Sequence, residues 1–423
     1  MKILSEKSVL RGKVLVPASK SHTIRAVAIS TLARGKSMIH HPLVSADCIA
    51  STNAGRLFGA GIRLGDCWEV EGVNGKPCVP ENIVDVKNSG TTMNFFMGTA
   101  ALVDGTTVLT GDEQIVRRPI QPLVDALNGL GANVLSTRNN GRPPVVVKGP
   151  LKGGRTRFSA IVSTYLSSLL INCPLAEQDS ELDVYELPEK SYIHMTLGWL
   201  DRQKIRYETS DDFSHFKLYG GQSYQGQEVT IPGDFSSATF FLVAGAIMEG
   251  DILLQGLDMN DRQGDKKVIS YLEEMGAKIH FEENGIRVQG GSLRGIELDM
   301  SDTPDALPAM AVAGCFAKGK TMIRNVANAR LKETDRISVM AKELGRLGAK
   351  IEELPDGLII HESALHGCAV QSYGDHRVVM SLAVAGMAIP GQTVVDRAEA
   401  AEVTVPNFVD LMLKIGGNIR VEI

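Results

Sequence analysis

Leu130-Gly131-Ala132-Asn133-Val134 recurs along the chain as Met275-Gly276-Ala277-Lys278-Ile279 and as Leu347-Gly348-Ala349-Lys350-Ile351. Weaker copies of this pattern are Leu57-Phe58-Gly59-Ala60-Gly61-Ile62, Asp201-Arg202-Gln203-Lys204-Ile205 and Ile415-Gly416-Gly417-Asn418-Ile419. The central residues of the copies, 60, 131, 203, 276, 348 and 416, are 71, 72, 73, 72 and 68 positions apart. Since 423/6 is 70.5, six repeated units account for the whole chain.

A helical pattern precedes each clear copy, and a strand-like alternation such as Lys278-Ile279-His280-Phe281 follows it. The Gly between them suits a left-handed cap at the end of a helix. A second strand is indicated upstream, where a Gly is followed four residues later by Ile, Leu or Val: Gly35–Ile39, Gly105–Leu109, Gly250–Leu254, Gly319–Ile323 and Gly391–Val395. The sequence therefore predicts an α/β protein in which a small unit of strands and helices is repeated six times.

Composition excludes several classes of function. Lys and Arg number 44 and Asp and Glu number 49, so the formal charge of −5 gives no bulk attraction for nucleic acid or an anionic membrane. The longest apolar runs, 238–248 and 307–317, are shorter than the roughly 18 residues of a membrane span and predict buried helices. The first seven residues lack the pattern of a signal peptide. We expect a cytoplasmic protein without membrane or nucleic acid partners.

The segment Thr230-Ile231-Pro232-Gly233-Asp234-Phe235-Ser236-Ser237 has the character of a junction, with three units on either side. Asp234 or Ser236 can cap a helix that we expect to begin near Ala238.

Basic or amide-rich segments stand at predicted helix starts in both halves of the chain. They are Ser19-Lys20-Ser21 through Arg25, Asn88-Ser89-Gly90-Thr91-Thr92, Arg117-Arg118-Pro119-Ile120, Lys332-Glu333-Thr334-Asp335-Arg336 and Asp375-His376-Arg377. Taken singly, each is equally well explained as a solvated helix cap or a surface ion pair. Together they suit small substrates rich in phosphate and carboxylate, held by fixed cations without a metal.

Asp305 lies at another predicted helix start, in Asp302-Thr303-Pro304-Asp305-Ala306. A carboxylate there can serve as a general base, and a structural cap explains it equally well.

These segments, with Gly233-Asp234-Phe235-Ser236-Ser237-Ala238, resemble those of the enolpyruvyl transferases, in the same order from Ser19 to Arg377. The most similar branch is that of the 5-enolpyruvylshikimate-3-phosphate (EPSP) synthases, the 3-phosphoshikimate 1-carboxyvinyltransferases. The resemblance implies a two-domain fold of six βαβαββ units, three per domain, with the active site in the interdomain cleft. It implies a discontinuous domain of residues 1–14 plus 229–423 and an inserted domain of residues 15–228.

The resemblance also implies a reaction and its residues. The enolpyruvyl group of phosphoenolpyruvate is transferred to the 5-hydroxyl of shikimate 3-phosphate by addition and elimination, with release of phosphate, in chorismate and aromatic amino acid biosynthesis. The implied phosphoenolpyruvate-binding residues are Lys20, Asn88, Gly90, Arg118, Arg336 and Arg377. Asp305 takes the acceptor's hydroxyl proton, and Glu333 with Lys20 handles the proton at C3. The implied acceptor-binding residues are Ser21, Arg25, Ser163, Thr164, Tyr192, Asp305, Asn328 and Lys332. The family implies no cofactor and no metal, and we expect a monomer.

The chain departs from the family pattern around the acceptor's 3-phosphate. The family's Ser-Ser-Gln run reads Val162-Ser163-Thr164 here, Glu189 replaces a Ser, and Asn94 stands where an Arg is frequent. A carboxylate at Glu189 would repel a phosphate at close range. One interpretation is an enolpyruvyl transferase with a different hydroxylated carboxylate acceptor, such as unphosphorylated shikimate. The other is a repacked phosphate site in which Ser163, Thr164 and Lys190 bind.

Two further interpretations are weaker. The sister enzyme that acts on UDP-N-acetylglucosamine carries a reactive Cys at the position of Glu113. A catalytically inactive homologue that binds an anion would have no need to keep Lys20, Asp305 and Glu333 together.

Overall fold

The computed structural model describes all residues from Met1 to Ile423 and contains 12 α-helices and 24 strands. The chain forms two compact units. The split unit comprises Met1–Ser19 and Pro232–Ile423, and the inserted unit comprises Lys20–Ile231. Every strand lies in one of six four-stranded sheets, three in each unit, so the α/β class and the six repeats are confirmed.

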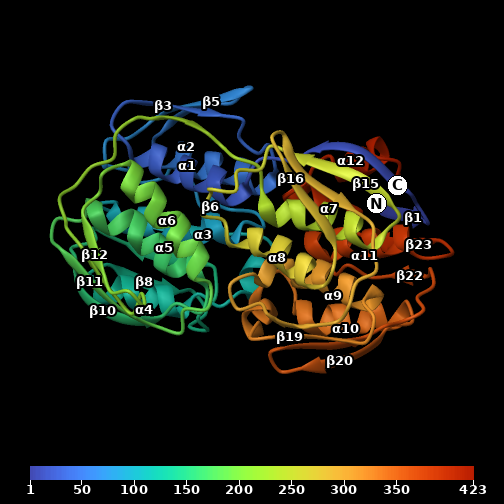
Figure 1. The fold of residues 1–423 in the computed structure, drawn as a ribbon. Coiled ribbons are helices and arrows are strands. Elements are labelled where there is room, and N and C mark those ends of the chain that lie inside the picture. Colours follow the sequence, from blue (N-terminus) through green and yellow to red (C-terminus); the bar gives the residue numbers. More distant parts are fainter. The chain divides into compact units, whose positions relative to one another are not determined.

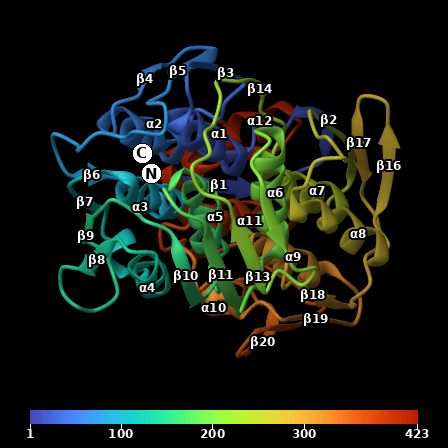
Figure 2. The ribbon, with the colours of Figure 1, turned by 90° about the vertical axis from the view of Figure 1, so that its left-hand side faces the viewer.

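The inserted unit holds the sheets β14-β3-β5-β4, β6-β7-β9-β8 and β10-β11-β13-β12. Their strands are β3 (Lys36–His40), β4 (Gly61–Arg63), β5 (Cys67–Glu71), β6 (Val84–Asp85), β7 (Thr106–Thr110), β8 (Asn133–Ser136), β9 (Val145–Lys148), β10 (Gly154–Ser159), β11 (Ser180–Tyr185), β12 (Tyr207–Thr209), β13 (His215–Leu218) and β14 (Glu228–Thr230). The helices are α1 (Lys20–Leu32), α2 (Ala46–Leu57), α3 (Gly90–Leu102), η1 (Ile115–Arg117), α4 (Gln121–Gly129), α5 (Ser163–Asn172), η2 (Cys173–Leu175) and α6 (Lys190–Arg202). Figure 2 shows β10, β11 and β13 side by side.

The split unit holds the sheets β16-β17-β15-β2, β18-β19-β21-β20 and β22-β23-β1-β24. Their strands are β1 (Lys2–Glu6), β2 (Leu10–Leu15), β15 (Gly250–Gln255), β16 (Lys278–Glu282), β17 (Gly285–Gln289), β18 (Glu297–Asp299), β19 (Lys320–Arg324), β20 (Lys350–Leu354), β21 (Gly357–His361), β22 (Ala369–Val370), β23 (Thr393–Asp396) and β24 (Asn418–Glu422). The helices are α7 (Phe235–Ile247), η3 (Gly264–Lys266), α8 (Lys267–Glu274), η4 (Pro304–Ala306), α9 (Leu307–Phe316), η5 (Ala327–Leu331), α10 (Arg336–Arg346), α11 (His376–Ala388), η6 (Ala398–Val403) and α12 (Phe408–Lys414).

One repeat shows the connectivity of the βαβαββ unit. The chain runs through β18, α9, β19, α10, β20 and β21 in that order. β18 pairs in parallel with β19, where Leu298 faces Ile323, and β19 pairs antiparallel with β21, where Ile323 faces Leu358. β20 and β21 form an antiparallel hairpin in which Ile351 faces Ile360. The parallel pair needs a helical crossover, whereas the hairpin needs only a turn, which accounts for the spacing of the elements along the sequence.

The two helices of a repeat differ in burial. In the split unit the first helices, α7, α9 and α11, contact one another, and nearly all of their residues are buried (Figure 1). The second helices, such as α10, bury one face and expose the other. A helix that is apolar all round belongs in a core, and the apolar runs 238–248 and 307–317 are such helices, as predicted. None of the helices has the length and apolar character that crossing a membrane requires.

Two of the six sheets take their first strand from a distant part of the sequence. β2 pairs in parallel with β15, and β14 pairs in parallel with β3. β1 completes the last sheet of the split unit, between β23 and β24. The chain leaves the split unit after Ser19 and returns to it at Pro232, where the N–H of Ser19 donates to the carbonyl of Pro232 at 2.8 Å.

Candidate active site

Arg336, the first residue of α10, is buried at the centre of a group of charges in the split unit whose other members are buried or partly buried. Its guanidinium donates from Nε to Asp375 Oδ2 at 2.8 Å, from Nη1 to Asp305 Oδ1 at 2.7 Å and from Nη2 to Glu333 Oε2 at 2.6 Å. The side chain of Arg336 is only 1% exposed. We call this group the Arg336 cluster, and its members are Asp305, Lys332, Glu333, Arg336, Asp375, His376 and Arg377.

Local sequence at two helix starts builds this cluster. Asp335 caps α10 by accepting from the N–H of Ser338 at 3.1 Å, and Asp375 caps α11 by accepting from the N–H of Arg377 at 2.9 Å. Thr334 Oγ1 donates to Asp375 Oδ2 at 3.0 Å. The two predicted helix starts are therefore confirmed, and their capping carboxylates bring Arg336 and Arg377 to the same place.

Asp305 lies on η4, directly before α9, and three cations surround its carboxylate. Arg377 Nη2 donates to its Oδ2 at 2.9 Å, and Lys332 Nζ lies 3.9 Å from its Oδ1. Burial by itself would raise the pKa of Asp305, but the charges of Arg377, Lys332 and Arg336 hold that pKa well below its usual range. Asp305 is thus kept as a carboxylate, the form that can accept a proton.

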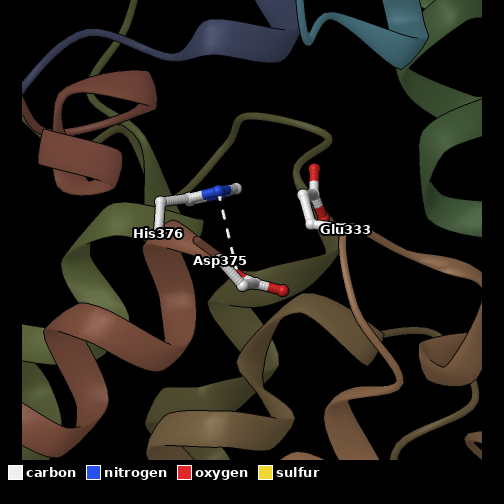
Figure 3. Close-up of side chains that lie close together, drawn as sticks. All are labelled: Glu333, Asp375 and His376. Carbon is white, nitrogen blue, oxygen red and sulfur yellow. Dashed lines mark ion pairs between the residues drawn. The ribbon is translucent and has the colours of Figure 1, made fainter. Parts of the chain in front are cut away.

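Glu333, Asp375 and His376 offer ligand atoms within 4.8 Å of one another, the spacing of a possible metal site (Figure 3). His376 Nδ1 lies 3.9 Å from Asp375 Oδ1. However, Arg336 donates to both oxygens of Asp375 and to Glu333, so a metal ion would have to displace a guanidinium from these carboxylates. The geometry favours an ion-pair network over a metal centre.

In the inserted unit, Lys20 is the first residue of α1, and its side chain pairs with a carboxylate. Lys20 Nζ lies 3.2 Å from Asp47 Oδ2, and the exposed fractions of the two side chains are 13% and 5%. Asp47 stands in the first turn of α2, behind the N-cap residue Ser45. The neighbouring carboxylate fixes the ammonium group at the start of α1.

Asn88, Gly90 and Arg118 form a second group in this unit. Arg118 Nη2 donates to Asn88 Oδ1 at 3.1 Å, and Asn88 Nδ2 donates to Asp112 Oδ2 at 2.8 Å. A Cβ atom on Gly90 would lie 2.5 Å from Arg118 Nη1, so the absence of a side chain at Gly90 lets the guanidinium lie against the start of α3. The sequence predicted all three residues as neighbours of one anion, and the structure brings them together. The helix after Arg118 begins at Gln121, and Pro122 lies in its first turn.

Arg25, which is expected to bind the acceptor, joins Ser21 and Tyr192 through their backbone carbonyls. Its guanidinium donates to the carbonyls of Ser21 at 3.0 Å and Tyr192 at 3.2 Å, and its Nε donates to Thr196 Oγ1 at 2.9 Å. Burial lowers the pKa of Arg25 to about 10. The buried guanidinium therefore ties α1 to α6 and positions the residues around it.

Ser163 and Thr164 open α5, where each already has a side-chain partner. The carboxylate of Glu189 accepts from the Ser163 hydroxyl and, at 3.4 Å, from the Ser163 N–H. Asn94 Nδ2 donates to Thr164 Oγ1 at 2.7 Å. Glu189 is buried, at 1% exposed, so it supplies an internal negative charge at the N-terminus of α5. Two residues that depart from the family pattern, Asn94 and Thr164, thus contact each other, and a third, Glu189, bonds the neighbouring Ser163.

Sequence reasoning missed several partners of the predicted residues. Asp47 and Asp112 were not selected, and Asp375 and His376 were quoted in a motif without a role. A capping carboxylate directly before a helix that carries an Arg in its first turn was the available signal for Asp375. Asn328 lies buried on η5, close in sequence to Lys332.

Comparison with known proteins points to the same family as the sequence motifs. The chain matches the family described as EPSP synthase (3-phosphoshikimate 1-carboxyvinyltransferase) over residues 4–412. It is 55% identical over 414 residues to the 3-phosphoshikimate 1-carboxyvinyltransferase of Acetivibrio thermocellus, with 98% of each chain covered. The enzyme of the same name from Ruminiclostridium cellulolyticum is 51% identical over 416 residues, again with 98% of each chain covered.

A solved structure of an EPSP synthase from Acinetobacter baumannii superposes with a TM-score of 0.84 at 27% identity, covering 100% of both chains. The relatives and the solved structure match the chain over nearly its whole length, so the likeness extends to both units. With the six-sheet fold and the Arg336 cluster, these matches place the chain in the EPSP synthase (3-phosphoshikimate 1-carboxyvinyltransferase) family.

Proposed function

We propose that this chain transfers the enolpyruvyl group of phosphoenolpyruvate to the 5-hydroxyl of shikimate 3-phosphate and releases phosphate. Membership of the EPSP synthase family supports the reaction. The observation that carries the mechanism is Asp305, a partly buried carboxylate surrounded by Arg336, Arg377 and Lys332. A base that cations keep ionised beside an anion-binding set suits a reaction between two anionic substrates.

The phosphoenolpyruvate-binding set consists of Lys20, Asn88, Gly90, Arg118, Arg336 and Arg377. Its cations neutralise the phosphate and the carboxylate of the substrate, and arginine forks suit both groups. Arg336 already donates to three carboxylates, so it can hold a substrate carboxylate only by releasing one of them. Glu333 is the member of the three that the mechanism needs to move, because it handles a proton.

The acceptor-binding set consists of Ser21, Arg25, Ser163, Thr164, Tyr192, Asp305, Asn328 and Lys332. Within this set, Arg25 is buried and acts by fixing the backbone of Ser21 and Tyr192. Lys332 lies 3.9 Å from Asp305 and supplies a positive charge beside the base. The matched family and the relatives are named for the phosphorylated acceptor and give no support to unphosphorylated shikimate.

The chemistry has two steps. In the addition, Asp305 takes the proton of the acceptor hydroxyl, the oxygen attacks C2 of phosphoenolpyruvate, and Glu333 with Lys20 delivers a proton to C3. In the elimination, C3 returns a proton to Glu333 with Lys20, the bond from C2 to the phosphate oxygen breaks, and phosphate leaves. Fixed cations stabilise the charge that develops on the departing phosphate.

We also propose a domain organisation and the state in which the protein works. We propose that residues 1–14 with 229–423, and residues 15–228, act as domains, and that residues of both contribute to one reaction. The protein works as a cytoplasmic monomer, without cofactor or metal, on small substrates and not on nucleic acid or membranes.

Phosphate release from phosphoenolpyruvate tests the proposal. The protein is assayed with shikimate 3-phosphate, with shikimate and with no acceptor, and the product is identified by mass spectrometry. We expect release only with shikimate 3-phosphate, together with a product heavier by the enolpyruvyl group. Release that needs no acceptor, or no release with any of them, would overturn the proposal.

A further inference from the structure

Asp112 is a half-buried carboxylate to which the proposed reaction assigns no role. It follows β7, and Asn88 follows β6, which pairs with β7 in parallel, so both residues lie at the same edge of the sheet. The N–H of Asp112 donates to the carbonyl of Lys87 at 2.9 Å. A Cβ atom on Gly111 would collide with the same carbonyl oxygen, so the close approach of the two loops needs this glycine.

The two oxygens of the Asp112 carboxylate have different partners. Oδ1 accepts from the backbone N–H groups of Gln114 at 2.9 Å and Ile115 at 3.0 Å, an Asx turn that opens η1. Oδ2 accepts from Asn88 Nδ2 at 2.8 Å. The other end of the same amide, Asn88 Oδ1, accepts from Arg118 Nη2 at 3.1 Å. Asp112, Asn88 and Arg118 therefore form one hydrogen-bonded network, which we call the Asp112 network.

The Asp112 network allows the Asn88 amide one orientation. A carboxylate can only accept hydrogen bonds and a guanidinium can only donate them, whereas an amide has one end of each kind. Asn88 must therefore turn its NH2 group to Asp112 and its oxygen to Arg118. Rotation of the amide by half a turn would break both bonds, so Asp112 fixes the oxygen that Arg118 Nη2 contacts.

We propose that Asp112 is a positioning residue, which fixes the Asn88 amide and thereby holds the Arg118 guanidinium in the orientation that binds phosphoenolpyruvate. This inference rests on the proposed role of Arg118 in binding that substrate. The amide of Asn88 carries no net charge, so its bond orients the guanidinium without neutralising it. The positive charge then acts on the phosphate or the carboxylate of the substrate.

The side-chain signals of Asn88 and Arg118 test the network without any assay of activity. Proton–nitrogen NMR spectra of the unliganded wild type and of Asp112→Asn are compared, and the two signals are identified by their loss in Asn88→Ala and Arg118→Lys. In Asp112→Asn the remaining oxygen stays with the backbone N–H groups, and an NH2 group faces Asn88. We expect both signals to shift. An Arg118 signal that stays in place would overturn the inference, whether or not the chain binds phosphoenolpyruvate.

Steady-state kinetics separates positioning from the capping of η1. Asp112→Asn should raise the KM for phosphoenolpyruvate about tenfold, with a smaller change in kcat, because one bond to a charged group is lost. Its free energy of unfolding stays close to that of the wild type, since the bonds to Gln114 and Ile115 remain. Asp112→Ala loses those bonds too, so it is destabilised and has a similarly raised KM. A wild-type KM in Asp112→Asn would show that Asp112 only caps η1.

A second substitution tests whether Asp112 acts through Asn88. In Asn88→Ala the amide is absent, so adding Asp112→Asn should leave KM where Asn88→Ala alone puts it. A further rise of about tenfold would contradict the proposal, because independent effects multiply. If Asp112→Asn does not fold, Asp112→Ser takes its place, since a hydroxyl can still cap η1 but is too short to reach Asn88.

The split unit supplies a matched control. Asp299 Oδ1 accepts from the N–H of Ser301 at 3.0 Å, and Asp299 Oδ2 accepts from Asn325 Nδ2 at 2.8 Å. Asn325 belongs to neither substrate-binding set, so Asp299→Asn breaks the same kind of bond and should keep the wild-type KM. An equal rise in KM in Asp299→Asn would contradict a specific role of Asp112. A wild type that releases no phosphate would contradict the proposed function instead, and the NMR comparison would still decide the role of Asp112.

Discussion

Arg336 Nη1 donates to Asp305 Oδ1 at 2.7 Å, and the arginine that makes this bond is almost completely buried. The pair joins the start of α10 to the start of α9 and keeps the proposed base as a carboxylate. The same guanidinium also holds Glu333 and Asp375, so chemistry and stability depend on one residue.

Asp305→Asn should abolish turnover while leaving substrate binding largely intact. The amide keeps the size of the carboxylate but cannot take the acceptor's proton, and loss of a general base costs about 10²–10⁴-fold in kcat. Phosphate release measures the rate, and calorimetry measures the binding of shikimate 3-phosphate. A variant with the wild-type rate would remove Asp305 from the mechanism.

Arg336→Met should destabilise the protein by about 3–5 kcal/mol, because the buried Asp375 and the partly buried Asp305 and Glu333 lose their common counter-ion. The free energy of unfolding is measured by urea denaturation. Arg324→Met is the matched control in the same unit, since Arg324 and its partner Glu297 are both exposed and lie 3.4 Å apart. Exposed pairs contribute about 0–1 kcal/mol, so equal losses in the two variants would contradict the central place of Arg336.

Gly90→Ala should raise the KM for phosphoenolpyruvate by about tenfold, or ~1.4 kcal/mol of binding, with a smaller change in kcat. The new Cβ would lie 2.5 Å from Arg118 Nη1 and force the guanidinium away from the start of α3. Gly345→Ala is the control, because no atom lies within 4 Å of a Cβ at that position of α10. Steady-state kinetics decides, and an unchanged KM in Gly90→Ala would show that Arg118 does not bind this substrate.

Glu189→Gln should lower the dissociation constant of shikimate 3-phosphate by about tenfold. The amide can still accept from Ser163, but the buried negative charge at the start of α5 is gone. Unphosphorylated shikimate provides the comparison, because it lacks the group that the charge repels. Equal effects on both ligands would mean that Glu189 does not lie near the phosphate.

The free energy of unfolding should depend on pH through Asp265 and Asp305 in opposite directions. Unfolded Asp has a pKa of about 3.9. The pKa of Asp265 in the folded chain is about 7, so its contribution to stability is complete below pH ~4 and is lost as the pH rises towards 7. The pKa of Asp305 is lowered on folding, so its contribution is present above pH ~4 and is lost on acidification.

Urea denaturation at pH 4.5, 6.0 and 7.5 separates these contributions. Asp265→Asn should fall less in stability than the wild type over this range, because the amide has no proton to lose. Parallel curves for the two proteins would contradict the raised pKa of Asp265.

Local pattern was sufficient to predict the repeat and most of its elements. Gly131, Gly276 and Gly348 follow helices with φ of +90°, +98° and +101°, the left-handed conformation that favours glycine. The strands expected after Gly105, Gly250 and Gly319 are β7, β15 and β19. Helical and strand periods relate residues a few positions apart, so they are visible in the sequence. The expected reaction and its residues came from the resemblance of the motifs to those of a known family.

Helix starts were less certain where a distant side chain supplies the cap. We expected a helix near Ala238 capped by Asp234 or Ser236. Asp234 is the N-cap residue of α7, but its side chain makes no capping bond, and the helix begins at Phe235, whose N–H donates to Gln263. Ser236 instead donates to Asp265. Neither partner is visible from the segment itself, because both come from the loop before α8.

Contacts between distant segments are visible only in the tertiary structure. β2 pairs with β15 although more than 200 residues separate them, and Lys20 pairs with Asp47 across two helices. The convergence of Arg336 and Arg377 on Asp305 depends on how α9, α10 and α11 pack. Such packing maximises burial over a whole unit and compensates each buried charge with another, and no short stretch of sequence contains that information.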